Sequence, residues 1–226
     1  SVNKFFEYLR QSGHAAIVPD NLEYMEELYG PRVVLSPEDI SSLYEATYIK
    51  KWFAKEETWE YQGAIQQRDR AMLGIYYGCG LRKSEGTNLI TSDILTERKL
   101  IFVRKGKGCK ERYVPVTDGN LSYITEYLQD GRNFLLNRSE SGTDTFFINQ
   151  YGQSCSDQAL SARLDRLVKN SGRAGLQRKK PTLHTLRHSI ATHLLQSGME
   201  IEMIQKFLGH ASLESTQIYT HIANEL

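Results

Sequence analysis

Segments with helical periodicity make up most of this chain, and glycine-containing breaks separate them. Ser36-Pro37-Glu38-Asp39 is typical of a helix start, because it combines an N-cap residue, a proline in the first turn and two carboxylates near the positive end of the helix dipole. Gly198 and Gly209 interrupt the apolar periodicity in the last part of the chain. The spacing of apolar residues predicts helices over 38–53, 64–78, 156–170, 183–197, 200–208 and 213–222.

Two short runs rich in aliphatic and aromatic residues depart from this pattern. Residues 100–104 and 112–116 have strand character, and the segment 105–111 between them is basic and contains two glycines. This arrangement predicts a hairpin, and 146–149 is expected to add a third strand. The predicted fold class is therefore α+β: a mostly helical domain with a small antiparallel three-stranded sheet.

Size and composition limit the class of protein. A chain of 226 residues, 40% of them hydrophobic, can bury one sizeable core. No apolar run approaches the roughly 18 residues that a membrane span needs, and no signal-peptide pattern opens the chain. The cysteines Cys79, Cys109 and Cys155 have neither a disulfide framework nor zinc spacing. We expect a protein of the reducing, cytoplasmic compartment, without contact to a membrane.

The helix start at residue 36 also marks the expected beginning of the main domain, 36–226. Val2, Phe5, Phe6 and Leu9 form an apolar stripe on a short predicted helix within 1–13, and such a helix needs a partner to cover that stripe. Residues 14–35 contain Gly30, Pro19 and Pro31 and are expected to be a linker.

The formal net charge of +1 hides an uneven distribution. Residues 98–112 hold seven basic side chains and one glutamate, and residues 163–187 hold eight basic side chains and one aspartate. Two such islands on one side of the molecule would suit a polyanion such as a nucleic acid. Two solvated basic faces would give the same pattern, so charge alone does not decide between them.

Several residues with catalytic chemistry recur at suggestive spacings. His184 and Arg187 lie three residues apart, which places them on one face near the amino end of a predicted helix. Arg82 is followed by Glu85 at the same spacing, and Tyr219 lies near the carboxyl end. Taken singly, each has a plainer interpretation, such as a helical ion pair or a core tyrosine.

Together these residues belong to five motifs that resemble the catalytic domain of the tyrosine recombinase, or phage integrase, family. The resemblance is Xer-like and covers roughly residues 36–222. The motifs are Gly80-Leu81-Arg82-Lys83-Ser84-Glu85, Gly106-Lys107-Gly108-Cys109-Lys110-Glu111-Arg112, His184-Thr185-Leu186-Arg187-His188, Leu208-Gly209-His210 and Tyr219-Thr220-His221. Gly86 departs from the family pattern, which usually has a bulky aliphatic residue there.

The resemblance implies that Tyr219 attacks a DNA phosphodiester, giving a 3'-phosphotyrosine and a free 5'-hydroxyl without metal or cofactor. The chemistry of the residues agrees. A phenol with a pKa of about 10 needs help to lose its proton, and guanidiniums can clamp non-bridging phosphate oxygens. Expected roles are a phosphate clamp for Arg82 and Arg187, a general acid for Lys107, and hydrogen bonding for His184 and His210, with His184 the better candidate base. Glu85 is expected to orient Arg82 or a histidine.

Basic residues outside that set are expected to contact the DNA backbone. They are Arg104, Lys105, Lys110, Arg112, Arg178, Lys179 and Lys180. Lys110 also competes with Lys107 for the role of general acid.

The expected partner is a double-stranded recombination site, bound by four protomers because strand exchange needs four. The segment 1–13 resembles the last helix of an upstream DNA-binding domain, so we expect a fragment that is monomeric without DNA. Two other classes of function remain open: a type IB topoisomerase-like nicking and closing enzyme, and a catalytically silent DNA-binding module whose segment 183–208 resembles a helix-turn-helix.

Overall fold

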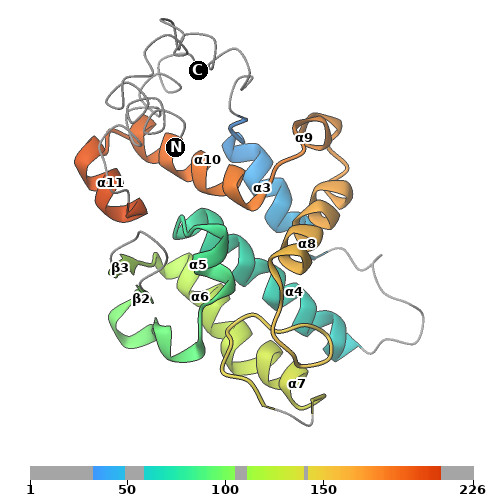
Figure 1. The fold of residues 1–226 in the computed structure, drawn as a ribbon. Coiled ribbons are helices and arrows are strands. Elements are labelled where there is room, and N and C mark those ends of the chain that lie inside the picture. Colours follow the sequence, from blue (N-terminus) through green and yellow to red (C-terminus); the bar gives the residue numbers. More distant parts are fainter. Residues whose placement is uncertain (1–32, 49–58, 105–110, 140–141, 210–226) are drawn as a thin grey trace, which may run out of the picture. The chain divides into compact units, whose positions relative to one another are not determined.

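A computed structural model describes residues 33–48, 59–104, 111–139 and 142–209 (Figure 1). Its α-helices are α3 (Pro37–Ala46), α4 (Trp59–Leu73), α5 (Lys83–Thr87), α6 (Asp118–Glu126), α7 (Arg132–Leu136), α8 (Asp157–Asn170), α9 (Ala174–Lys179), α10 (Leu183–Gln196) and α11 (Ile201–Leu208). Its strands are β1 (Ile94–Leu95), β2 (Leu100–Val103) and β3 (Arg112–Pro115). Short 3-10 turns flank β1 at Thr91–Asp93 and Thr96–Arg98. The predicted fold class is confirmed.

Most of the predicted helices that fall on described residues are present. The α3 helix begins as expected, with the Ser36 side chain accepting from the Asp39 backbone N–H and the Asp39 carboxylate reaching back to the Ser36 N–H. It ends at Ala46, before the predicted end at 53, and α4 begins at Trp59, before the predicted start at 64. The helices α8, α10 and α11 follow the predicted ranges within one residue. The predicted helices within 1–13 and over 213–222 lie outside the described residues.

The sheet is antiparallel in the order β1-β2-β3. Ile101 pairs with Val114, and both side chains are buried. The prediction of a third strand at 146–149 is wrong, since the third strand is β1. Phe146 and Phe147 are fully buried and pack on Tyr127, so this apolar run fills the core instead of extending a sheet edge. Burial on all sides produces the same sequence pattern as an inner strand.

Two helical stretches continue through π-helical turns. The π segment η3 (Gly74–Gly78) extends α4, and η6 (Tyr127–Gly131) joins α6 to α7. The helical stretch 118–136, which contains Gly119 and Gly131, is not among the predicted helices. The reason for Gly131 is packing: a Cβ there would lie 3.0 Å from the Ala64 Cα of α4. This glycine therefore permits close approach of two helices and does not break one.

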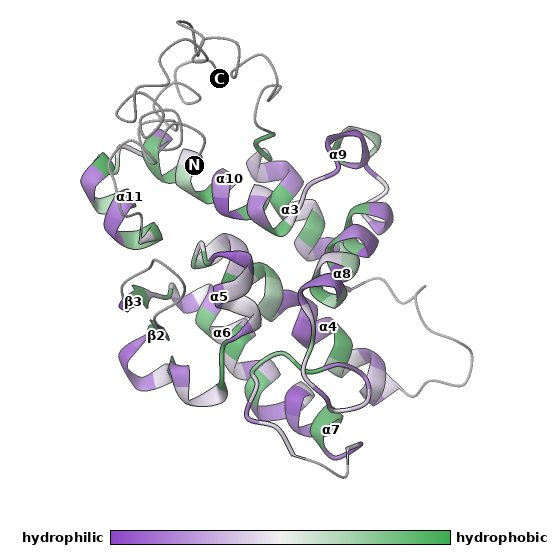
Figure 2. Ribbon diagram, in the orientation of Figure 1, coloured by the Kyte–Doolittle hydropathy of each residue, from purple (hydrophilic) through white to green (hydrophobic). Residues whose placement is uncertain are grey.

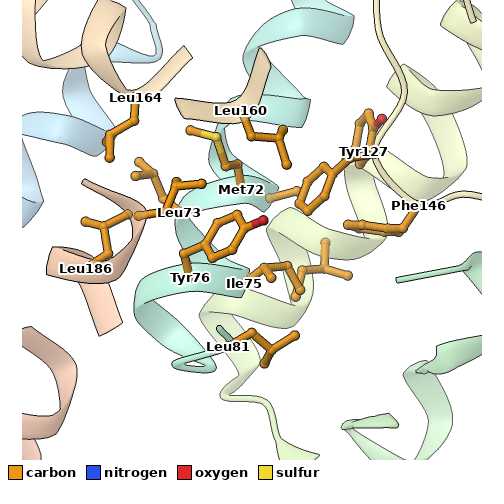
Figure 3. Packing of buried hydrophobic residues seen from close by; sticks show 14 of the residues in the cluster. Met72, Leu73, Ile75, Tyr76, Leu81, Tyr127, Phe146, Leu160, Leu164 and Leu186 are labelled. Atoms are coloured by element: carbon orange, nitrogen blue, oxygen red, sulfur yellow. The ribbon is translucent and has the colours of Figure 1, made fainter. Parts of the chain in front are cut away.

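One hydrophobic cluster joins these elements (Figure 3). Leu160 and Leu164 of α8 lie opposite Met72 and Leu73 of α4 in this cluster. The remaining face of α8 is largely hydrophilic, as its colouring in Figure 2 shows. Leu35 is also fully buried, and its N–H donates to the Ser189 hydroxyl of α10 over 2.9 Å. The packed domain thus includes residues just before the start expected at 36.

The described helices give no candidate for crossing a membrane, because none combines sufficient length with sufficient apolar character.

Candidate active site

Arg82 and Glu85 are held together by the short helix α5. Arg82 is its N-cap residue, and the Glu85 carboxylate reaches back to accept from the Arg82 backbone N–H over 2.8 Å. The same carboxylate accepts from Arg82 Nη1 over 2.7 Å. A glutamate three residues into a helix is well placed for both contacts. The guanidinium of Arg82 is thus held by contacts within the domain.

Arg187 approaches from α10, which begins with a capping box between Thr182 and Thr185. It is only 2% exposed, and its guanidinium donates to the Gly80 carbonyl over 2.5 Å and to the Leu208 carbonyl over 2.8 Å. Its Nη1 also lies 3.8 Å from Glu85 Oε2. A buried guanidinium needs such acceptors, because leaving it without them would cost several kcal/mol. Gly80 has a φ of +59°, a conformation that suits glycine at this turn.

The last turn of α11 supplies acceptors to this site. The carbonyl oxygen of Gly209 accepts from Arg82 Nη2 over 2.8 Å, next to the Leu208 carbonyl that accepts from Arg187. The carbonyl end of a helix carries partial negative charge and therefore suits guanidiniums. Arg82 and Arg187, which lie more than 100 residues apart in the sequence, are brought together by one carboxylate and one helix end.

A third arginine lies in the same cluster. Arg112 of β3 donates from Nη1 to Glu85 Oε1 and from Nη2 to Glu85 Oε2, each over 2.9 Å. We expected Arg112 to contact the DNA backbone, but the structure directs its guanidinium to Glu85. The sequence holds a signal for this arrangement: Arg112 has the same strand parity as the buried Val114, whereas Tyr113 between them is exposed.

The electrostatic consequence for Glu85 is a strongly acidic carboxyl group. Its burial acts to raise the pKa, but the hydrogen bond and the positive charge of Arg112, together with the contacts to Arg82, outweigh burial and lower the pKa to about 2. Glu85 is therefore ionised near neutral pH. One buried negative charge facing three guanidiniums leaves a net positive site that suits a phosphate.

His184 is exposed near the amino end of α10, one turn before Arg187. Its ring lies edge-on to the ring of His188, with centroids 4.2 Å apart. Lys107, His210 and Tyr219, together with Lys105 and Lys110, lie outside the described residues, so their expected roles stay predictions.

The basic residues expected to contact DNA have different surroundings. Lys179 Nζ lies 2.5 Å from Asp39 Oδ2 and so links α9 to α3. Arg104 donates to Asp93 over 2.8 Å, although half of its side chain remains exposed. Arg178 and Lys180 are exposed at the end of α9.

The island 163–187 is thus divided into internal and surface charges. Arg163 is paired with Asp69, and Arg187 is buried, while Arg173 and Lys179 face Asp39. The other four cations of the island, Arg166, Lys169, Arg178 and Lys180, are exposed. Across the described ranges, no group of three His, Cys, Asp or Glu side chains is arranged to hold a metal ion.

Comparison with known sequences identifies similar proteins. The sequence model of the phage integrase family matches residues 34–225. The chain is 37% identical over 220 residues to tyrosine recombinase XerD of Pseudomonas putida, covering 97% of this chain and 67% of that protein. It is 43% identical over 165 residues to tyrosine recombinase XerC of Oceanobacillus iheyensis, covering 71% of this chain and 51% of that protein.

Solved structures agree with these relatives. The crystal structure of XerA recombinase matches with a TM-score of 0.68 and 30% identity, covering 85% of this chain and 61% of that chain. XerH site-specific recombinase, bound to a palindromic difH substrate in a post-cleavage complex, matches with a TM-score of 0.67 and 28% identity, covering 86% of this chain and 51% of that chain. The chain spans about half to two thirds of the length of these proteins.

Proposed function

Because this chain belongs to the phage integrase family of tyrosine recombinases, we propose that it carries out the strand cleavage and joining of a site-specific DNA recombinase. The Tyr219 oxygen attacks a phosphodiester and forms a bond to phosphorus, while the 5'-oxygen leaves. The resulting 3'-phosphotyrosine keeps the energy of the broken bond. The 5'-hydroxyl of a partner strand then attacks this linkage, restores a phosphodiester and releases Tyr219.

The observation that carries this proposal is the placement of Arg82 and Arg187 around Glu85. Phosphoryl transfer develops negative charge on the non-bridging oxygens, and preplaced donors stabilise that charge without reorganisation. One such donor is typically worth roughly 3 to 4 kcal/mol in the transition state. Bidentate guanidiniums suit the task better than lysines.

The proton transfers are assigned to residues around this clamp. The Tyr219 hydroxyl passes its proton to His184, which is exposed one turn before Arg187. Lys107 protonates the leaving 5'-oxygen, with Lys110 as the alternative donor, and His210 donates a hydrogen bond to a non-bridging oxygen. General acid catalysis of this kind typically contributes about 100- to 10,000-fold.

The proposed substrate is double-stranded DNA, in line with the recombination-site complexes solved for XerH. The exposed cations Arg166, Lys169, Arg178 and Lys180 offer charges for backbone phosphates. Exchange of strands between two sites requires four active sites, so we propose a tetramer on DNA. We also propose that 36–226 is the catalytic domain and that 1–13 belongs to an upstream domain.

A covalent trapping experiment tests the cleavage reaction. Nicked duplexes with a randomised core, in which the strand beyond the nick diffuses away after cleavage, are incubated with the chain and resolved under denaturing conditions. We expect an adduct that Tyr219→Phe abolishes, and sequencing the trapped DNA identifies the site. Absence of any adduct, with DNA binding retained, would instead support a binding module.

A second assay separates recombination from nicking and closing. Two copies of the trapped site carrying different flanks are mixed with the protein. Recombinant flanks are expected, whereas relaxation of supercoiled DNA without exchange would indicate the topoisomerase-like alternative.

A further inference from the structure

Arg112 makes a two-pronged contact to Glu85. Both terminal nitrogens of Arg112 donate to the carboxylate over 2.9 Å, and the side chains of Arg112 and Glu85 are only 10% and 6% exposed. Arg82 reaches the same carboxylate through one terminal nitrogen and its backbone N–H. The planar fork of an arginine matches a carboxylate in this geometry, which fixes orientation as well as charge.

Arg112 also packs against the end of α11. Its Nε lies 3.4 Å from the Phe207 carbonyl, and a Cβ added at Gly209 would lie 2.7 Å from that nitrogen. The carbonyls of three successive residues, Phe207, Leu208 and Gly209, therefore accept from Arg112, Arg187 and Arg82 respectively. Arg112 connects the β2-β3 hairpin, α5 and the end of α11, three parts of the chain that meet only in the folded domain.

We infer that Arg112 is a positioning residue for strand cleavage: it holds the Glu85 carboxylate, and through that carboxylate it orients the guanidinium of Arg82 toward the scissile phosphate. This inference rests on the proposed function. It replaces our expectation that Arg112 contacts the DNA backbone, because both terminal nitrogens of Arg112 already donate to the Glu85 carboxylate.

The physical argument is one of competition for a single carboxylate. Glu85 is faced by Arg82 beside its own helix, by Arg112 from β3 and by Arg187 from α10. Without Arg112, the buried carboxylate loses two charge-assisted hydrogen bonds, so its pKa rises and its remaining partners no longer fix its position. The guanidinium of Arg82 is then no longer held in place, although Arg82 itself has not been substituted.

Single-turnover cleavage of the trapped site by Arg112→Gln tests the inference. At saturating DNA we expect cleavage about 10- to 100-fold slower than in the unmodified chain, with the Kd for DNA and its salt dependence unchanged. A backbone contact would give the reverse: a normal rate at saturation, weaker binding and a log Kd against log salt slope reduced by about one. That second result overturns the inference.

The pH profile supplies a readout that a purely structural role would not move. In the unmodified chain, Glu85 remains ionised well below pH 5, so cleavage has no acid limb from this group. In Arg112→Gln the carboxyl group protonates at a higher pH, and cleavage should fall as the pH drops below about 6. Identical profile shapes for the two proteins would contradict the inference.

Arg70→Gln is the matched control. Arg70 is also a buried arginine that donates to both oxygens of a glutamate, Glu126, over 3.1 Å each. It lies on α4 and does not contact Glu85. We expect this variant to lose stability and to keep both the saturating rate and the pH profile. Equal losses of rate in the two variants would overturn the inference, because loss of any buried arginine–glutamate pair would then slow cleavage.

A double-mutant cycle identifies the route of the effect. If Arg112 acts through Glu85, then adding Arg112→Gln to Glu85→Gln should slow cleavage by less than threefold further. If the rate reductions of the two single variants multiply in the double variant, the inference is overturned.

If Arg112→Gln fails to fold, Arg112→Lys takes its place. This variant keeps the charge but not the planar fork, and its cleavage rate should fall by a smaller factor. Failure of the unmodified chain to form an adduct would instead count against the proposed function.

Discussion

At the scale of single residues, one carboxylate organises the site. Glu85 contacts Arg82, Arg112 and Arg187, and its position at the third residue of a short helix ties all three to the local backbone. The three guanidiniums also share the carbonyl end of α11. Each arginine therefore has acceptors on two sides, and these contacts restrict its rotamers.

Replacing Arg187 by lysine should abolish most activity although the charge is kept. A lysine cannot satisfy the Gly80 and Leu208 carbonyls together, nor present a planar fork to phosphate. We expect single-turnover cleavage to fall about 100- to 1,000-fold, the typical effect of losing one transition-state donor. Arg98→Lys, at an exposed position, serves as the control and should cleave normally. A tenfold effect or less in Arg187→Lys would argue against a direct phosphate contact.

The acidity of Glu85 predicts a pH dependence of stability. Its pKa is lowered from the usual 4.5 to about 2, so its contribution to folding is complete above pH 4.5 and is lost as the pH falls toward 2. The shift corresponds to about 3 kcal/mol. Denaturant unfolding of the unmodified chain and of Glu85→Gln should show a free-energy difference that shrinks by that amount across this window. A difference that is constant with pH would refute the assignment.

At the scale of elements, α5 depends on its neighbours for stability. Five residues form too few internal hydrogen bonds for an independent helix. Tyr76 from the π segment η3 lies over this helix: its hydroxyl donates to the Lys83 carbonyl over 3.1 Å, and a Cβ at Gly86 would lie 2.7 Å from its ring. Thr87 at the other end donates to Asp157 of α8 over 2.5 Å. The ring of Tyr76 therefore occupies the space that a larger side chain at position 86 would need.

An exchange of side-chain volumes tests this packing. Gly86→Leu should clash with the ring of Tyr76, and Tyr76→Leu should leave a void, each costing about 1 to 4 kcal/mol of unfolding free energy. The double variant restores the total volume and should recover at least half of the summed loss. Denaturant unfolding measures all three. Simple addition of the two losses would show that the positions are not coupled.

At the scale of the whole molecule, part of the basic charge is paired with carboxylates inside the domain. Four of the eight basic residues at 163–187 are buried or paired with a carboxylate, and the other four are exposed. Asp39 of α3 faces both Arg173 and Lys179, so Lys179, which was expected to contact DNA, instead links α9 to α3. Only the exposed cations can add to the field that attracts a phosphate backbone.

Two adjacent lysines provide a direct comparison of these roles. Lys180→Gln should weaken DNA binding and reduce the slope of log Kd against log salt by about one, with stability unchanged. Lys179→Gln should leave that slope unchanged and lower the free energy of unfolding, because Asp39 loses a partner. Salt-dependent binding and denaturant unfolding on both variants check this. Equal salt slopes in the two variants would contradict it.

Local features of the sequence were sufficient to predict much of this protein. The start of α3, the ranges of α8, α10 and α11, and the β2-β3 hairpin follow from caps, periodicity and turn residues. The ordered motifs were sufficient to indicate the family and the pair of Arg82 and Glu85. Each of these features depends on a few residues that are close in the sequence, so it can be recognised without knowledge of the fold.

Pairings over long sequence separations came only from the folded domain. Strand parity places Arg112 on the same side as the buried Val114, but nothing near Arg112 or Lys179 in the sequence identifies Glu85 and Asp39 as their partners. Likewise, nothing distinguishes 146–149 from a strand until its burial is known. A guanidinium binds a phosphate or a carboxylate by the same hydrogen bonds. Whether an arginine contacts a carboxylate or a phosphate depends on where packing places its strand or helix. Burial of apolar faces brings distant segments together, and the charged side chains then pair with the acceptors that lie nearby.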